Sequence, residues 1–412
     1  MAWIRGRHGG PSPAGRKRAA VNCGGMRRRI GAWRTRREWL VVALVAAATA
    51  TFIGLVWLMA PAIERARLVD RYRDPQADWP RLQTLDGRDI EPLAALPEQP
   101  DFPANNPFSE AKAALGKRLF FDPRLSASNQ IACASCHDPS LGWADGRHQA
   151  VGHDRQVGPM NTPTVINAGY KKRLFWDGRA PDLETQIIAS WSNPIEMAGT
   201  PTQSARQLAG VAGYAPLFEA AYDDPRVTVD RMTRAIATFM RTLNTPNTRF
   251  DRFMRGARDT FTAAEIRGLD LFRGKANCVR CHNGALLTDG DFHHLGTSVH
   301  GVGNYLGRYR ETGAPEDVGA FQTPGLRNIG RTAPYMHNGF GEDIDIKSLL
   351  ALYNMGWWQN APPGEKTRDI PLAQLSPLIE PLGLSADEIN DLAAFLGTLD
   401  GASLYMAQPE LP

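Results

Sequence analysis

Cys133-Ala-Ser-Cys136-His137 and Cys278-Val-Arg-Cys281-His282 are two copies of one pattern, and they decide how the rest of the chain is interpreted. In each copy two residues separate the cysteines, and a histidine follows the second cysteine directly. Cys-x-x-Cys-His is the attachment pattern of a c-type haem, in which two thiols bond to the porphyrin and the imidazole binds the iron. The sequence therefore predicts two covalent haems, with His137 and His282 as proximal iron ligands.

Other uses of these residue types have to be weighed against haem. Thiolates and imidazoles also form zinc sites, and a Cys-x-x-Cys pair is typical of thioredoxin-like redox motifs. Two complete copies in an exported chain, with no further cysteine close to either, favour haem. The fifth cysteine, Cys23, precedes the apolar segment described next and is interpreted as an incidental thiol.

An uncharged segment near the N-terminus predicts how the chain meets the membrane. Trp39 to Ala60 holds 22 residues without a charge, which is long enough to cross a bilayer as a helix. Eleven Lys and Arg residues precede it within residues 1–38, so the positive-inside rule keeps the N-terminus cytoplasmic and exports the rest. We therefore interpret the basic segment as topogenic, with no nucleic-acid partner. Ala60-Pro61-Ala62 also resembles a signal-peptide cleavage site, which leaves anchor and cleaved signal as alternatives.

The remaining sequence predicts a linker followed by two mostly helical lobes. Residues 71–107 contain seven prolines and read as an extended spacer. Helix starts are expected near Ser109, at Thr262-Ala-Ala-Glu265 and at Ser385-Ala-Asp-Glu388. A weak repeat supports two lobes, because Gly116-Lys-Arg-Leu-Phe120 precedes the first cysteine motif and Gly268-Leu-Asp-Leu-Phe272 precedes the second.

Several further motifs give the chain a family resemblance. It resembles the bacterial di-haem cytochrome c peroxidases and their MauG-type relatives from about residue 107 to 400, through residues 115–126 (LGKRLFFDPRLS), 161–167 (NTPTVIN), 175–180 (FWDGRA), 195–197 (IEM), 326–329 (LRNI) and 334–339 (PYMHNG). The resemblance implies a mainly α fold of two cytochrome c-like helical lobes, each with one covalent haem, in addition to the N-terminal transmembrane helix.

The expected organisation of the chain follows from the resemblance together with the segments above. We expect five parts: a basic cytoplasmic segment (1–38), a transmembrane anchor or signal peptide (39–61), a Pro-rich linker (62–107), an N-terminal peroxidatic haem domain (108–255) and a C-terminal electron-transfer haem domain (256–412). The exported part is expected in the periplasm, held at the inner membrane or soluble if the signal is cleaved.

The resemblance also implies roles for residues near the first haem. His153 matches a distal ligand that leaves the iron when the enzyme is activated, although a solvated loop imidazole is the alternative from the residues alone. Glu196 matches the acid that handles protons during peroxide cleavage, and Gln186 matches a second polar residue of that pocket. Trp176 matches a tryptophan between the haems that relays electrons, although it can equally be a buried core aromatic.

Two further metal-binding roles are implied by the same resemblance. Asn161, Thr332 and Pro334 match the residues of a calcium site between the lobes, and hard oxygen ligands suit that ion. For the second haem iron, Tyr353 matches the tyrosine of MauG, whereas Met355 matches the methionine of the peroxidases. A helix turns about 200° in two residues, so only one of these two side chains can face the iron, and we favour Tyr353.

The predicted activity is reduction of hydrogen peroxide with electrons from a small soluble cytochrome c or cupredoxin. One alternative is a MauG-like oxidase that modifies a partner protein, which Tyr353 favours and His153 opposes. The other is a plain electron-transfer cytochrome, which Glu196 and Gln186 oppose because a carrier needs no proton-handling pocket. A homodimer is typical of the resembled family.

Overall fold

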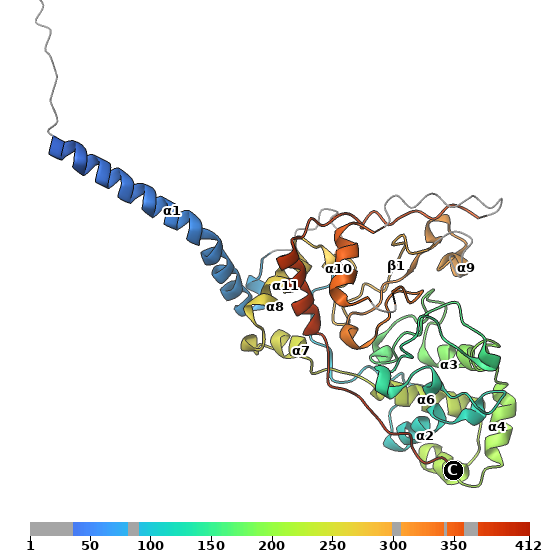
Figure 1. The fold of residues 1–412 in the computed structure, drawn as a ribbon. Coiled ribbons are helices and arrows are strands. Elements are labelled where there is room, and N and C mark those ends of the chain that lie inside the picture. Colours follow the sequence, from blue (N-terminus) through green and yellow to red (C-terminus); the bar gives the residue numbers. More distant parts are fainter. Residues whose placement is uncertain (1–35, 81–89, 299–305, 342–343, 358–369) are drawn as a thin grey trace, which may run out of the picture. The chain divides into compact units, whose positions relative to one another are not determined.

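The computed structural model describes residues 36–80, 90–298, 306–341, 344–357 and 370–412. Its regular structure is mostly helical (Figure 1), which confirms the predicted fold class. Two short strands, β1 (Phe292–His293) and β2 (Phe321–Gln322), pair antiparallel. The α-helices are α1 (Arg36–Arg73), α2 (Glu110–Phe120), α3 (Leu183–Ser192), α4 (Pro201–Ala209), α5 (Tyr214–Tyr222), α6 (Val229–Thr242), α7 (Arg249–Met254), α8 (Ala263–Arg273), α9 (Tyr309–Thr312), α10 (Ile346–Asn354) and α11 (Ala386–Gly397).

The chain divides into two compact units, Met1–Ala62 and Ile63–Pro412. In the first unit, the described residues belong to α1, which is long and apolar enough to cross a membrane. Large apolar side chains are exposed along it, including Trp39, Phe52 and Trp57. A helix satisfies its own backbone hydrogen bonds, and these apolar side chains need no polar partner. Lipid is therefore a suitable surrounding for this part of α1. A retained anchor and a signal peptide both have this form.

A first hydrophobic core in the second unit is built on the crossing of α2 and α6. Ser109 caps α2 by accepting a hydrogen bond from the Lys112 amide at 3.2 Å, which confirms the predicted helix start. A side chain at Gly116 would collide with the Ala235 carbonyl of α6, so glycine permits the close approach. Leu119 and Phe120 then enter the core, which also includes residues of α3, α4 and α5.

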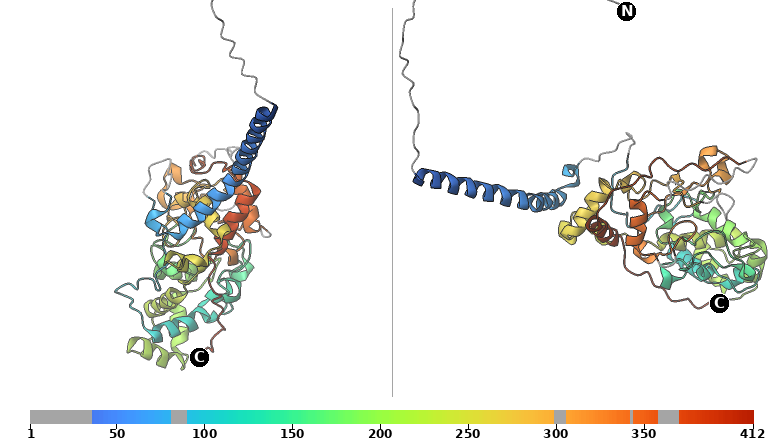
Figure 2. Two further views of the ribbon diagram at one scale, coloured as in Figure 1. Left: turned by 90° about the vertical axis from the view of Figure 1, so that its left-hand side faces the viewer. Right: turned by 45° about the horizontal axis from the view of Figure 1, so that its top comes forward.

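A second hydrophobic core repeats this arrangement with α8 and α11, which lie side by side in Figures 1 and 2. Capping boxes start both helices, Thr262 with Glu265 and Ser385 with Glu388, as the sequence predicts. Gly268 occupies the position of Gly116, and a side chain there would collide with a carbonyl of α11. In each core the Gly-x-x-Leu-Phe segment therefore lies on a helix whose glycine allows close packing, α2 against α6 and α8 against α11.

Part of residues 62–107, which we expected as an extended spacer, packs into the second core. Tyr72, Trp79 and Leu93 are buried there, and Tyr72 donates a hydrogen bond to Asp270 of α8 at 2.9 Å. Leu96 is also buried, and its amide donates to Asp251 of α7. Residues 90–107 contain no helix or strand, but their irregular backbone still lets Leu93 and Leu96 become buried.

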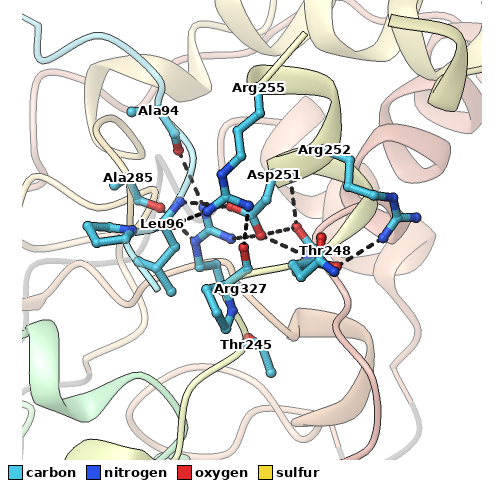
Figure 3. A network of polar contacts seen from close by, with 12 residues as sticks. Ala94, Leu96, Thr245, Thr248, Asp251, Arg252, Arg255, Ala285 and Arg327 are labelled. Carbon is cyan, nitrogen blue, oxygen red and sulfur yellow. Dashed lines mark hydrogen bonds and ion pairs between the residues drawn. The ribbon is translucent and has the colours of Figure 1, made fainter. Parts of the chain in front are cut away.

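A buried ion pair and its hydrogen bonds connect four separate stretches of this second unit (Figure 3). Arg327 and Asp251 lie 2.9 Å apart with both side chains buried. Arg327 Nε also donates to the Ala285 carbonyl at 2.6 Å, in the loop that follows the second cysteine motif. The Leu96 amide donates to the same aspartate at 2.8 Å. The network therefore fixes the loop behind His282 to α7 and to the chain around Leu96.

Candidate functional site

The first cysteine motif forms a tight turn at the wall of a cavity. Cys133 to Ser135 is a 3₁₀ turn, and the His137 amide donates to the Cys133 carbonyl at 3.0 Å. His137 Nδ1 lies 3.2 Å from the Trp143 carbonyl, a distance at which it donates a hydrogen bond. Cys133, Cys136 and His137 line a cavity of about 430 Å³. The turn thus brings both thiols and one imidazole to the same space.

The second motif has the same geometry in the other core. Cys278 to Arg280 is a 3₁₀ turn, and the His282 amide donates to the Cys278 carbonyl at 2.8 Å. His282 Nδ1 lies 3.0 Å from the Leu287 carbonyl. Cys278, Cys281 and His282 line a second cavity of about 230 Å³. The sequence repeat is therefore also a repeat of side-chain geometry.

Both sites fit a covalent haem. With Nδ1 of each imidazole held by a backbone carbonyl, Nε2 is the nitrogen left to bind iron, the usual arrangement for a ligating histidine. Burial lowers the pKa of His137 and of His282, which favours the neutral imidazole that binds a metal. Neither cysteine pair forms a disulfide, so the thiols are available for thioether bonds. The cavities are lined largely by apolar side chains, as a porphyrin requires.

Glu196 and Gln186 both line the first cavity together with His137. Gln186 Nε2 donates to the Ser190 hydroxyl at 2.9 Å within α3. Asn193 Nδ2 donates to Glu196 Oε1 at 2.6 Å. Burial raises the pKa of Glu196, against the opposing effect of hydrogen bonds from Ser190 and Asn193. The cavity therefore contains a partly desolvated carboxyl group held between Ser190 and Asn193, with Gln186 bonded in turn to Ser190.

Ser190 and Asn193 were missed by the sequence analysis. Their signal was weak, because a serine in the last turn of a helix and an asparagine just before Pro194 are ordinary residues for a helix end. Only the folded geometry shows that their side chains reach the two residues that the sequence did single out.

His153 lies outside the residues that line either cavity. Its backbone amide donates to the Ile195 carbonyl at 3.0 Å and to the Glu196 carbonyl at 2.8 Å. Its Nδ1 is buried and has no hydrogen-bond partner in the described part of the chain. The loop that carries His153 is thus attached to the loop that carries Glu196, while the assignment of His153 as an iron ligand stays a prediction.

Trp176 lines both cavities. Its indole Nε1 donates to the Asn161 carbonyl at 2.9 Å, which fixes the ring orientation. The ring of His337 lies 6.5 Å away, edge-on, and stacks in turn on Phe321 at 3.6 Å. This position between the cavities is the one that an electron relay requires, and it equally satisfies the need of a buried indole for a hydrogen-bond acceptor.

The two candidate ligands of the second iron lie in very different surroundings. Tyr353 lines the second cavity, and burial beside Cys281 and Cys278 raises the pKa of its hydroxyl. Met355, at the end of α10, is 63% exposed and lies outside the lining. The geometry therefore favours Tyr353, in agreement with the helical phase of the sequence.

The three residues matched to a calcium site all border the second cavity. Asn161 Nδ2 donates to the Arg147 carbonyl at 2.8 Å, which orients the side-chain amide. The Thr332 hydroxyl lies 3.4 Å from the Asn328 carbonyl. The three residues thus lie on the wall of one cavity, and the calcium ion itself stays a prediction.

Comparison with known proteins identifies the family. Residues 110–259 match the family model of the di-haem cytochrome c peroxidases. The methylamine utilization protein MauG of Methylorubrum extorquens is 39% identical over 331 residues, covering 78% of this chain and 88% of that protein. The chain belongs to the di-haem cytochrome c peroxidase family.

Other relatives agree with this assignment. Cytochrome c551 peroxidase of Nitrosomonas europaea is 35% identical and aligns with 78% of this chain and 87% of its own length. A MauG-like protein associated with microbial copper homeostasis has a known crystal structure, with a TM-score of 0.66 and 30% identity over 79% of this chain and 97% of its own. The di-haem peroxidase BthA of Burkholderia thailandensis shares the fold, with a TM-score of 0.60 and 24% identity over 80% of this chain and 95% of its own.

Membership has two direct consequences. The chain is an oxidoreductase of a family whose members named cytochrome c peroxidase act on peroxide. Members of this family carry two c-type haems, in agreement with two cysteine motifs and two cavities.

Proposed function

We propose that this protein reduces hydrogen peroxide to water in the periplasm with electrons from a small carrier protein, a soluble cytochrome c or a cupredoxin. The balanced reaction takes one peroxide, two electrons and two protons to two waters. The observation that carries this proposal is the half-buried carboxyl group of Glu196 in the wall of the cavity beside Cys133, Cys136 and His137.

The haems would be held by the two motifs. Cys133 and Cys136 would attach the first haem and His137 would bind its iron, while Cys278, Cys281 and His282 would do the same for the second. When bound, the haems supply the redox-active iron at which peroxide is reduced and through which electrons are delivered. In this proposal residues 108–255 form the peroxidatic domain and residues 256–412 the domain that accepts electrons.

Glu196 is the residue proposed to move protons. Cleavage of peroxide needs one group that removes a proton from the nearer oxygen and returns it to the departing one. A carboxyl group whose pKa is raised by burial is better matched to this task near neutral pH than an ordinary glutamate. Asn193 holds its Oε1, and the Gln186–Ser190 hydrogen bond limits where the remaining polar groups point. Trp176, which lines both cavities, would relay electrons between the haems.

A second candidate function is oxidation of a partner protein, as in a MauG-like enzyme. The observation that favours it is Tyr353 in the wall of the second cavity, with Met355 exposed. An anionic phenolate stabilises ferric iron, whereas a thioether stabilises ferrous iron and raises the potential. A low-potential second haem would suit the removal of electrons from a partner.

Donor oxidation distinguishes these functions. The full-length holoprotein in detergent is mixed with a reduced small cytochrome c or a reduced cupredoxin, and peroxide is then added. We expect two donor molecules to be oxidised for each peroxide consumed. Consumption of peroxide that leaves the donors reduced would indicate a different electron source, as in the second candidate function. No consumption at all would indicate a plain electron carrier.

A further inference from the structure

Positively charged side chains on the cavity walls differ in how their charge is balanced. Four arginines line the cavities, and Arg310 among them is exposed to solvent. The other three form ion pairs with carboxylates: Arg179 with Asp177 at 2.7 Å, Arg280 with Glu380 at 3.6 Å and Arg327 with Asp251 at 2.9 Å. Lys171 lines both cavities, and within the described residues no carboxylate lies in ion-pair distance of it. The positive charge of Lys171 therefore has no counter-charge among the described side chains.

The backbone holds Lys171 at this position firmly. Asn167 adopts a left-handed conformation, and the 3₁₀ turn Ala168–Tyr170 follows it. The Lys171 amide closes the turn by donating to the Ala168 carbonyl at 3.1 Å. The Tyr170 hydroxyl donates to the Pro97 carbonyl at 2.7 Å, on the other side of the turn. The backbone of Lys171 is thus held by the turn that precedes it, and its side chain lines both cavities.

Lys171 is half-buried, and its partial removal from water makes an unbalanced ammonium group costly. A buried cation is normally paired with an anion or loses its proton, and burial lowers the pKa of Lys171 accordingly. A c-type haem brings two ionised propionate groups, because attachment uses its vinyl groups. Haem bound in the two cavities would therefore bring carboxylate anions close to Lys171.

We propose that the Lys171 ammonium group binds a haem propionate where the two cavities meet. The bound carboxylate balances the charge of the lysine, and the lysine in turn stabilises the more negatively charged, ferrous form of that haem. Lys171 is then a cofactor-binding residue that raises the reduction potential of at least one haem. This inference rests on the two attached haems of the proposed function, and it is independent of which reaction they perform.

Spectroelectrochemical titration of the full-length holoprotein tests the proposal without any turnover. Lys171→Met removes the charge and keeps the length of the side chain, so at least one haem should become about tenfold harder to reduce, a shift of about 59 mV towards negative potential. Lys171→Arg keeps the charge and should shift the potential less. Lys172→Met, at the exposed neighbouring position, should leave both potentials unchanged.

Haem content of the same variants covers the case in which Lys171→Met does not retain its cofactors. Loss of haem from Lys171→Met with retention in Lys171→Arg supports binding through charge. Equal loss from both variants would indicate a packing role and overturn the proposal. Two attached haems with unchanged potentials in Lys171→Met would overturn it as well. A protein that lacks peroxidase activity can still show these potential shifts, so failure of the proposed function can be told apart from failure of the Lys171 proposal.

Discussion

Asn167 and Asn328 donate side-chain hydrogen bonds to the same oxygen, the hydroxyl of Thr245, at 3.2 and 2.9 Å. Both asparagines have left-handed backbone conformations, with φ of 62° and 63°, and each precedes a 3₁₀ turn. One turn leads to Lys171 and the other to Thr332, and both of these residues border the second cavity. A single buried threonine therefore joins two equivalent turns, one from each half of the haem-binding region.

The first prediction concerns this shared hydroxyl. Thr245→Val keeps the shape of the side chain but removes the acceptor of both amides. A buried donor left without a partner costs about 1–3 kcal/mol, so the free energy of unfolding should fall by at least that amount. Urea unfolding followed by circular dichroism measures it. Thr260→Val, whose hydroxyl donates to the exposed Ala257 carbonyl, should cost less, and equal losses would contradict the shared role.

Local chemistry explains what the sequence could predict. The helix starts at Ser109, Thr262 and Ser385 depend on side chains within three residues, and all three caps form. The cysteine motifs are likewise self-contained turns, because each histidine is held by a backbone carbonyl a few residues later.

Contacts between distant parts of the chain explain what the sequence could not predict. Tyr72 and Trp79 lie in a stretch whose sequence resembles a spacer. They are buried because they pack against the second core, where Tyr72 bonds Asp270 of α8, 198 positions later in the chain. The position of Lys171 at the cavities is of the same kind. Its neighbours Lys172 and Arg173 make it look like one member of an exposed basic run.

The second prediction concerns haem attachment. Replacing Cys133 and Cys136 with alanine should leave one covalent haem per chain, and replacing Cys278 and Cys281 should also leave one. Haem staining of denatured gels and quantitation of the pyridine complex give the count. Cys23→Ala serves as the control and should retain two. A colourless protein that contains zinc would contradict the haem assignment of both motifs.

The third prediction concerns the ligand of the second iron. Tyr353→Phe should change the absorption spectrum of one haem, because Tyr353 lines its cavity. Met355→Leu should change neither spectrum, because that side chain is 63% exposed. The oxidised protein should also lack the weak far-red absorption of methionine-ligated ferric haem. A far-red band that disappears in Met355→Leu would instead assign the methionine as ligand.

The fourth prediction concerns the network in Figure 3. Asp251→Asn leaves the buried Arg327 guanidinium without its counter-charge, which should lower the free energy of unfolding by about 3–5 kcal/mol. Lys275→Met removes one partner of the more exposed pair with Glu388 and should cost at most about 1 kcal/mol. Urea unfolding of both variants gives the comparison. Similar costs would show that the buried pair contributes no more than a surface pair.

The fifth prediction concerns proton handling by Glu196, which is the centre of the proposed function. Glu196→Gln keeps the size of the side chain but removes the basic oxygen beside the first haem site. Turnover should fall by about 10²-fold or more, a typical general acid–base contribution. Glu219→Gln, which changes an exposed glutamate outside the cavity lining, is the matched control and should retain full turnover.

Peroxide-dependent donor oxidation by Glu196→Gln, measured with both haems attached, is therefore the most direct test. The account predicts two intact haem spectra together with the loss of turnover, while the Glu219→Gln protein remains active. Full peroxidase activity in Glu196→Gln would contradict it, because the carboxyl group in the cavity wall would then have no part in the reaction.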